Sequence, residues 1–175
     1  MASSLRGQLL IAAPSLYDYF RRAVLLVLDH TEEGAMGVVL NRPSETAVAE
    51  AVPALAELAG DDELVRIGGP VSPQSIVALG DFEDPEEAGT ALTGSIGVLD
   101  PDQLHPSLRR LRVYAGYAGW APGQLDGEVE DGAWIVEPLE PDDPFRDDDL
   151  WTATLERKGG GYSLLATMPA DPSLN

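Results

Sequence analysis

Four polar residues at the ends of two predicted strands are the best candidates for chemistry in this sequence: Arg21, Arg22, Asn41 and Arg42. With a hairpin turn at residues 31–34, strand pairing puts Asn41 near Val24, so the four residues meet at one end of the sheet. Three guanidiniums gathered there would bind an anion or a carboxylate, because arginine presents paired N–H donors to such groups. The sequence therefore predicts a ligand-binding corner for a small anion.

This corner has a second interpretation. The arginines could instead form ion pairs with Asp18 or Glu45, which would give them a structural role. A catalytic pair of His30 and Asn41 is excluded, because six residues of extended chain separate the two by roughly 20 Å along the sheet. Ligand binding and ion pairing both stay open at the level of sequence.

A glycine-rich segment at residues 116–124 is a candidate border of the corner, together with the turn Gly68-Gly69-Pro70. The segment has neither the dinucleotide-binding G-x-G-x-x-G pattern nor the Lys-Ser/Thr of a P-loop. The helix predicted to follow it could bind an anion at its first N–H groups, but Asp126 and Glu128 already satisfy the helix dipole. Glycines beside Trp120 also suit a ring packed flat on backbone. Gly68, Gly69 and Trp120 are thus candidate ligand contacts, with packing as the alternative.

The familiar catalytic and metal-binding sets are absent from the sequence. Its two histidines, His30 and His105, form no H-E-x-x-H pair, and Gly94-Ser95-Ile96-Gly97 is not a G-x-S-x-G nucleophile elbow. The aspartates within residues 142–149 lack the glycine and the terminal glutamate of an EF-hand loop. No metal ion and no cofactor is therefore expected.

Length, charge and the absence of cysteine exclude several classes of protein. The 175 residues include 11 Lys and Arg against 30 Asp and Glu, a formal net charge of −19, and the hydrophobic share of 44% is that of a folded domain. The absence of cysteine excludes disulfides, thiolate zinc sites and cysteine nucleophiles. No secretory signal is apparent, and the longest strongly apolar run, residues 23–28, is far too short to span a membrane. We expect a cytoplasmic protein without membrane contact.

The charge also argues against direct binding of nucleic acid. Acidic side chains crowd residues 81–87 and 137–149, and the nearest approach to a basic cluster is Arg109, Arg110 and Arg112. A surface this negative repels a polyanion over about one Debye length, roughly 8–10 Å in physiological salt. The expected partner is a small anionic ligand or another protein. The oligomeric state stays open.

The predicted elements alternate irregularly between strand and helix, which is typical of the α+β class. Short apolar runs predict strands at residues 8–13, 23–29, 35–40, 64–67, 75–79, 96–99, 111–117, 133–136 and 162–166. Helical spacing predicts helices at residues 46–58, 100–108, 122–130 and 145–157, the first of them interrupted at Pro53. The helical residues expected to face the core are Leu125, Val129, Leu150, Trp151 and Leu155.

Three separated blocks of the sequence resemble the AlgH/YqgE-like family of uncharacterised bacterial proteins. They are residues 30–43 (HTEEGAMGVVLNRP), 68–71 (GGPV) and 116–125 (GYAGWAPGQL), the last continuing to Trp134, and the final residues 171–175 also match. The resemblance covers nearly the whole chain. It implies a single α+β domain over residues 1–175, with a core at about 7–168 and a short C-terminal tail. The implied sheet is mixed, bent and split into a partial barrel, with helices packed outside.

Some members of this family carry a label as regulators of transcription, and no agreed enzyme activity comes with the resemblance. The chain is therefore predicted to be a non-enzymatic binding or regulatory protein. Its candidate ligand-binding residues are Arg21, Arg22, Asn41, Arg42, Gly68, Gly69 and Trp120. The alternatives are a transcriptional regulator that acts on DNA or through a protein partner, and a hydrolase with carboxylate and metal chemistry.

Overall fold

The computed structural model describes residues 4–16, 19–60, 62–100 and 106–167. The strands are β1 (Gln8–Ala12), β2 (Val24–Thr31), β3 (Gly34–Val39), β4 (Pro43–Ala47), β5 (Leu64–Ile67), β6 (Val71–Phe82), β7 (Thr90–Thr93), β8 (Ile96–Val98), β9 (Leu108–Trp120) and β10 (Trp134–Pro138). The helices are α1 (Val48–Ala51), α2 (Ala56–Ala59), α3 (Gln124–Glu130), α4 (Leu150–Lys158) and α5 (Gly161–Leu165), with short 3-10 turns η1 (Pro53–Leu55), η2 (Pro85–Glu87) and η3 (Asp143–Phe145). None of the described helices is long and apolar enough to cross a membrane.

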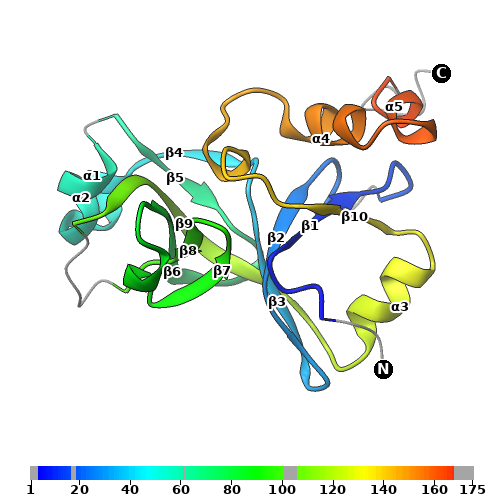
Figure 1. Ribbon diagram of the computed structural model, residues 1–175, viewed down its shortest axis with the longest axis horizontal. Helices are drawn as coiled ribbons and strands as arrows, with labels where there is room; N and C mark the ends of the chain where they lie inside the picture. The colour runs from blue at the N-terminus through cyan, green and yellow to red at the C-terminus, as the bar shows by residue number, and fades with distance from the viewer. Residues whose placement is uncertain (1–3, 17–18, 61, 101–105, 168–175) are drawn as a thin grey trace.

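The sheet is organised around the long strand β9 (Figure 1). Along one edge β9 pairs antiparallel with β6, from Tyr117 opposite Val71 to Leu108 opposite Phe82. Its other edge is divided between β5, which runs parallel to it, and β3, which runs antiparallel. The sheet therefore splits into a β3–β2–β1–β10 branch and a β5–β4 branch. The predicted α+β class and the split mixed sheet are confirmed, and within the part of the chain that the structure describes the sheet does not close into a barrel.

Two helices cover opposite faces of the β3–β2–β1–β10 branch. Alternate residues of a strand point to opposite faces, and in β1 one set packs around Trp151 of α4 while the other packs around Leu125 of α3. Because both faces are covered, β1 and the first part of β2 are apolar at consecutive positions. Of the helical residues expected in the core, Leu125, Leu150, Trp151 and Leu155 are buried, and Val129 is partly buried against the cluster that contains Leu125.

The helix expected at residues 46–58 is not continuous. Its first residues are extended as β4, and Pro53 divides the remainder into α1, η1 and α2. A proline ring removes one backbone N–H and clashes with the preceding turn, so a single helix does not pass through it. Gly60 ends α2 as expected, with φ at 96°. Val48 of α1 and Leu55 of η1 are buried against the part of the sheet formed by β6 and β9.

The strand expected at residues 162–166 is instead the helix α5. A short apolar run does not by itself distinguish a strand from a helix. Gly159 ends α4 with φ at 77°, and α5 then packs against α4. The helix expected at residues 100–108 falls mostly outside the described residues, but Leu108 already belongs to β9.

Candidate functional site

The hairpin register predicted from the sequence is confirmed. His30 pairs with Ala35, and Asn41 lies beside Val24, whose N–H donates to Asn41 Oδ1 at 3.0 Å. Asn41 Nδ2 donates to the carbonyl of Arg22 at 2.9 Å. The Asn41 amide therefore joins the residues before β2 to those after β3, and it supports the left-handed backbone of Arg22, whose φ is 55°.

The three arginines of this corner are neighbours, but two of them stack on different rings. Arg42 donates from Nη2 to the carbonyl of Arg21 at 3.2 Å and lies over the ring of Tyr19 at 4.6 Å. Arg22 lies over an indole ring of α4 at 4.4 Å. Asp18, one of the two expected ion-pair partners, lies outside the described residues. In the structure, the contacts of these arginines are thus a hydrogen bond to a backbone carbonyl and stacking on aromatic rings.

Gly68 and Gly69 lie where the turn between β5 and β6 presses on the backbone of β9. A Cβ atom at Gly68 would lie 2.4 Å from the carbonyl oxygen of Gly116, and one at Gly69 would lie 2.1 Å from the carbonyl carbon of Tyr117. No side chain is accommodated at such distances. These glycines permit a close approach of two backbones, which favours packing over ligand contact.

Trp120 lies at the far end of the hairpin from Asn41, because it pairs with Ala35 next to the turn. Its indole N–H donates to Glu128 Oε1 at 3.1 Å, and the same oxygen accepts the indole N–H of Trp134 at 2.8 Å. This carboxylate fastens α3 to two strands of the sheet. The structure does not bring Trp120 to the arginine corner, and its contacts are those of a packed residue.

Next to Asn41 lies a cavity of about 330 Å³ that the sequence did not predict. It is bounded by β5, by β9 and by the loop before α4. Two buried arginines line it, one from each of these strands. The lining includes Asn41, Glu63, Arg66, Arg112, Arg146 and Asp147.

The pairing of β5 with β9 puts both arginines on one face of the sheet. Arg66 pairs with Tyr114, and Arg112 lies two residues before Tyr114 on the same strand. Paired residues of neighbouring strands share a face, as do residues two apart on one strand. The side chains of Arg66 and Arg112 are 11% and 8% exposed, so both guanidiniums are largely removed from water.

A single carboxylate oxygen joins the two arginines. Asp147 Oδ1 accepts from Nη2 of Arg66 and from Nη2 of Arg112, both at 3.0 Å. The Asp147 side chain is 78% exposed, in contrast to both guanidiniums. Arg112 has further partners in Glu63, 2.8 Å from its Nε, and in the carbonyl of Phe145.

Each of the two arginines keeps one buried N–H group without a partner among the described residues, namely Nε of Arg66 and Nη1 of Arg112. In a guanidinium, Nε and Nη2 share one edge, while Nη1 and Nη2 share another. Two donors on one edge match two oxygens of a carboxylate or a phosphate. Asp147 Oδ1 therefore accepts from Nη2 of both arginines, while the buried donor that shares an edge with that Nη2 has no partner among the described residues.

Burial perturbs two ionisable groups beside these arginines. It raises the pKa of the Glu63 carboxyl, a shift that Arg112 opposes and Asp147 reinforces. It also raises the pKa of the Tyr114 phenol, whose oxygen has no hydrogen-bond partner among the described residues. Protonation of Glu63 removes a negative charge next to Arg112. The cavity is therefore expected to attract anions more strongly as the pH falls.

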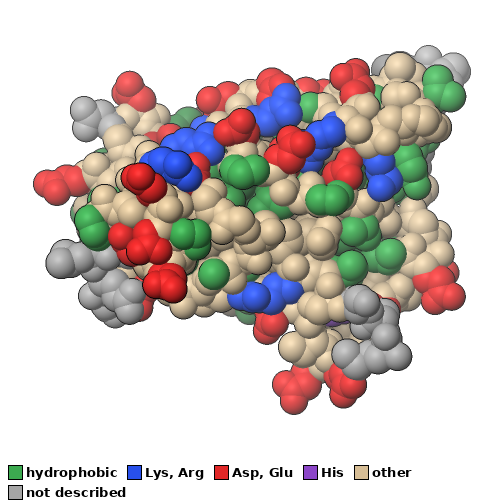
Figure 2. Space-filling view, in the orientation of Figure 1, with side chains coloured by type: hydrophobic (Ala, Val, Ile, Leu, Met, Phe, Trp, Pro, Cys, Tyr) green, Lys and Arg blue, Asp and Glu red, His purple; other side chains and the backbone are tan. Residues whose placement is uncertain are grey.

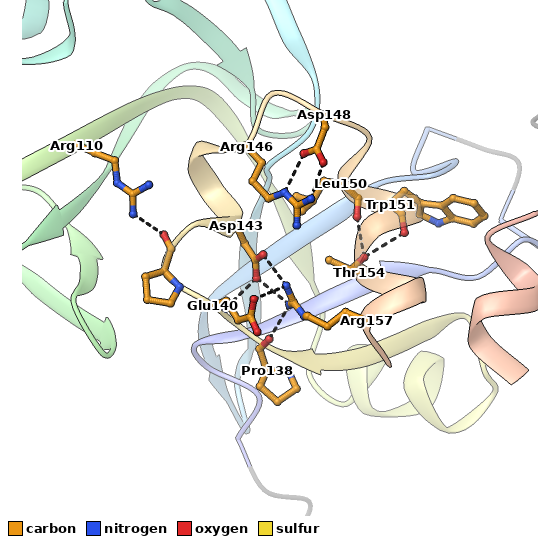
Figure 3. A network of polar contacts seen from close by, with 11 residues as sticks. Arg110, Pro138, Glu140, Asp143, Arg146, Asp148, Leu150, Trp151, Thr154 and Arg157 are labelled. Atoms are coloured by element: carbon orange, nitrogen blue, oxygen red, sulfur yellow. Dashed lines mark hydrogen bonds and ion pairs between the residues drawn. The ribbon is translucent and has the colours of Figure 1, made fainter. Parts of the chain in front are cut away.

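The neighbouring arginines are engaged more completely. On the face seen in Figure 2, Lys and Arg side chains lie in a band next to Asp and Glu side chains. Asp81, whose side chain is 5% exposed, accepts from Arg109 through Oδ1 and from Arg110 through Oδ2. Arg157 forms a two-point pair with the buried Asp143 (Figure 3). In Asp81 and Asp143 each carboxylate oxygen thus accepts from a different guanidinium nitrogen.

A profile of the AlgH-like family matches residues 9–163 of this chain. The chain belongs to the AlgH-like family. A UPF0301 protein of Streptomyces coelicolor is 46% identical to it over 189 residues, which cover 99% of this chain and 96% of the relative. A UPF0301 protein of Mycobacteroides abscessus is 40% identical, over 97% of this chain and 87% of the relative.

Two solved structures share the fold of this AlgH-like protein. The crystal structure of a protein from Corynebacterium diphtheriae has a TM-score of 0.86 at 31% identity, over 96% of this chain and 94% of that one. The solution structure of the AlgH protein from Pseudomonas aeruginosa has a TM-score of 0.70 at 28% identity, over 97% and 96%. The family and the fold implied by the three sequence blocks are thus confirmed.

In this AlgH-like protein, a sequence signal for the cavity lay in the strands that carry its arginines. Arg66 interrupts the apolar residues of β5, and Arg112 stands between Leu111 and Val113, which are both buried. A charged residue inside a buried strand predicts a buried partner or a ligand. The partner, Asp147, is 81 residues from Arg66 in the chain, so the sequence alone did not connect them.

Proposed function

We propose that this AlgH-like protein is a non-enzymatic binding protein that takes a small oxyanion in the cavity between Arg66 and Arg112. The observation that supports this most directly is the pair of half-filled guanidinium edges, since Arg66 Nε and Arg112 Nη1 have no partner among the described residues. Both donors are buried and belong to charged groups. An oxyanion with two or more oxygens is the class of ligand that completes both edges.

The folded protein already bears the cost of burying these arginines. An unpaired buried donor costs roughly 1–3 kcal/mol, and more when it belongs to a charged group. A ligand that pairs these donors removes that cost, and the guanidiniums do not have to be stripped of water at the moment of binding. Oxyanion binding should therefore raise the free energy of unfolding as well as occupy the cavity.

The volume of the cavity limits the size of the ligand. About 330 Å³ is near the lower end of the range for small-molecule sites, roughly 300–1,000 Å³. A carboxylate or phosphate group on a small molecule fits this space. The proposal thus keeps the class of ligand expected from the sequence but moves its position from the corner of Arg21, Arg22 and Arg42 to the adjoining cavity.

The test is a titration with inorganic phosphate and with malonate at constant ionic strength, measured by calorimetry. Arg66→Gln should weaken the binding of both probes at least about tenfold, because it removes the charge and the two-donor edge. Arg42→Ala is the matched control, since Arg42 stacks on Tyr19 in the neighbouring corner and lies outside the described lining of the cavity. It should bind both probes like the wild type.

Loss of binding in Arg42→Ala with unchanged binding in Arg66→Gln would place the ligand at the corner predicted from the sequence. Absence of binding by the wild type to either probe would contradict the proposal altogether. Circular dichroism of Arg66→Gln establishes whether its fold is intact. If that variant unfolds, Arg66→Lys, which keeps the charge but not the paired edge, should still bind more weakly than the wild type.

The other functions considered from the sequence have less support. A regulator that binds DNA directly would use Arg109, Arg110 and Arg112, but each of these forms an ion pair with a carboxylate of the protein itself. A duplex would have to displace those carboxylates against a net charge of −19. The hydrolase alternative draws only on the abundance of carboxylates. Regulation through a protein partner that recognises the anion-bound state is compatible with the proposal, as is a cytoplasmic location.

A further inference from the structure

We infer that Asp147 is a built-in competitor for the oxyanion, and that a ligand binds by taking the place of its carboxylate. The inference rests on the proposed function, since it concerns the same cavity. Asp147 Oδ1 lies 3.0 Å from Nη2 of both Arg66 and Arg112. An oxyanion that pairs with either two-donor edge needs this position for one of its own oxygens. Ligand and Asp147 carboxylate therefore exclude each other.

Asp147 fits the arginines less well than a free oxyanion would. Its one oxygen serves two guanidiniums, and one further donor on each stays without a partner among the described residues. A free phosphate or dicarboxylate can turn until two of its oxygens lie along one edge, and it can still reach the second arginine. The ligand thereby gains hydrogen bonds that the tethered carboxylate does not make.

The loop can release Asp147 at low cost. The side chain is 78% exposed, so its carboxylate already contacts water, and the incoming oxyanion takes over its pairing with the two buried guanidiniums. The neighbouring residues have separate partners: Asp148 pairs with Arg146 (Figure 3), and Asp149 caps α4 by accepting the N–H of Thr152. Rotation of one side chain is enough to open the site, and α4 keeps its cap.

A tethered competitor makes the cavity selective. A group on a short flexible link acts like a ligand at a local concentration on the order of millimolar. An anion that contacts the arginines through one atom, such as chloride, only replaces what Asp147 already supplies. Phosphate groups and dicarboxylates offer several oxygens and should displace it. Their apparent affinity is lowered in proportion to the time that Asp147 occupies the site.

The experiment compares Asp147→Asn with Asp142→Asn in the full chain, with inorganic phosphate and malonate as separate probes. Both variants remove one exposed negative charge from the connection between β10 and α4, but Asp147 pairs with Arg66 and Arg112 whereas Asp142 pairs with Arg110, outside the lining of the cavity. Asp147→Asn should bind phosphate at least about tenfold more tightly than the wild type. Asp142→Asn should stay within about threefold, because salt screens the general effect of charge that both variants share.

The two probes also separate the sources of the oxyanion. Tighter binding of phosphate than of malonate by Asp147→Asn identifies a phosphate-bearing ligand, and the reverse order identifies a dicarboxylate. A gain of affinity for either probe that is confined to Asp147→Asn supports the inference. Chloride should not compete with phosphate in the wild type beyond the effect of ionic strength.

A measurement on the wild-type protein keeps the inference testable even if Asp147→Asn does not fold. NMR of the Asp147 carboxyl carbon follows the side chain during a phosphate titration. Its chemical shift should move toward that of a hydrated, unpaired carboxylate at the same phosphate concentrations that fill the cavity. A shift that stays constant while the cavity fills would overturn the inference.

The outcomes distinguish this inference from the proposed function. If Asp147→Asn binds like the wild type while Arg66→Gln has lost binding, Asp147 is no competitor but the proposed function stands. Equal gains in both asparagine variants would also overturn the inference, because general charge would then account for them. If neither the wild type nor Asp147→Asn binds any probe, the proposed function itself fails.

Discussion

Two aspartates four residues apart, Asp143 and Asp147, pair with arginines in different ways. Asp143 is 1% exposed, and its two oxygens accept from Nη1 and Nη2 of Arg157 at 2.8 and 2.9 Å (Figure 3). It also accepts the backbone N–H of Glu140. Asp147 is exposed and uses one oxygen for two arginines. The first pair is complete, and the second leaves buried donors without partners among the described residues.

The difference separates an ion pair that supports the fold from one that, in the proposed function, a ligand replaces. A buried pair with every hydrogen bond made is costly to break, because removal of one partner leaves an uncompensated charge. An exposed carboxylate on buried guanidiniums is easily replaced by another anion, since only the arginines have lost their water. Burial of the carboxylate and completeness of its hydrogen bonds therefore distinguish the roles of two residues of identical chemistry.

The largest expected effect is a loss of stability when the ion pair between Asp143 and Arg157 is broken. Asp143→Asn should lower the free energy of unfolding by about 3 kcal/mol, because it breaks a two-point pair with a buried carboxylate and leaves Arg157 with Glu140 as its charged partner. Asp147→Asn should cost less, about 1–2 kcal/mol, because its own side chain is exposed and Arg112 keeps Glu63 as a partner, although the two guanidiniums it leaves are buried. Urea unfolding of the two variants measures both values. Equal losses would remove the distinction between the two aspartates.

The cluster of Asp81 with Arg109 and Arg110, in which both carboxylate oxygens are also paired, tests the same distinction through the pH dependence of stability. Burial opposes ionisation of Asp81, but hydrogen bonds from Ser95, Arg110 and Arg109 outweigh it and lower the pKa of its carboxyl. The unfolded chain therefore takes up this proton first as the pH falls. The stability that Asp81 contributes is complete above the ordinary carboxyl pKa and is lost as the pH falls through the lower folded value.

Asp81→Asn should accordingly cost about 2 kcal/mol near neutral pH, the range for hydrogen bonds to charged groups. Its stability should also decline less steeply than that of the wild type in the acid range below the ordinary carboxyl pKa. Urea unfolding over a series of pH values gives both results. Parallel declines in the variant and the wild type would show that Asp81 does not contribute to acid unfolding.

The smallest stability effect is expected at Glu63, which pairs with Arg112 in the cavity beside Asp147. Burial raises its pKa in the folded state, so its contribution to stability is complete below the ordinary glutamate pKa and is lost as the pH rises through the folded value. Glu63→Gln should abolish this decline. In the wild type, affinity for sulfate, which does not titrate in this range, should rise as the pH falls through the same window. An unchanged pH profile in Glu63→Gln would show that another group controls the cavity.

The corner at Asn41 could be predicted because its parts are close in the chain. A short turn sets the register of β2 and β3, and the register then puts Asn41 beside Val24. The faces of α3 and α4 were equally predictable, since helical spacing already separates Leu125 and Trp151 from polar neighbours. Local geometry determines such features before any tertiary contact forms.

The cavity could not be predicted in the same way. Arg66 and Arg112 share a face because β5 runs parallel to β9, and a parallel pair of strands has no short turn to define its register. Asp147 reaches both arginines only after the chain has passed through α3 and β10. The helix α5, expected as a strand, shows the same limit, because its packing on α4 decides the conformation of a short apolar run.

By itself, the sequence determined the family, the α+β class, the hairpin and the acidic character of this protein, because these depend on composition and on periodicities of a few residues. Only the tertiary structure decided which carboxylates meet which arginines. Strand periodicity assigns a side chain to a face, whereas burial and hydrogen-bond geometry depend on what the fold brings to that face. For that reason the cluster of arginines at the hairpin could be predicted from the sequence, whereas the buried donors of Arg66 and Arg112 that lack a partner among the described residues could not.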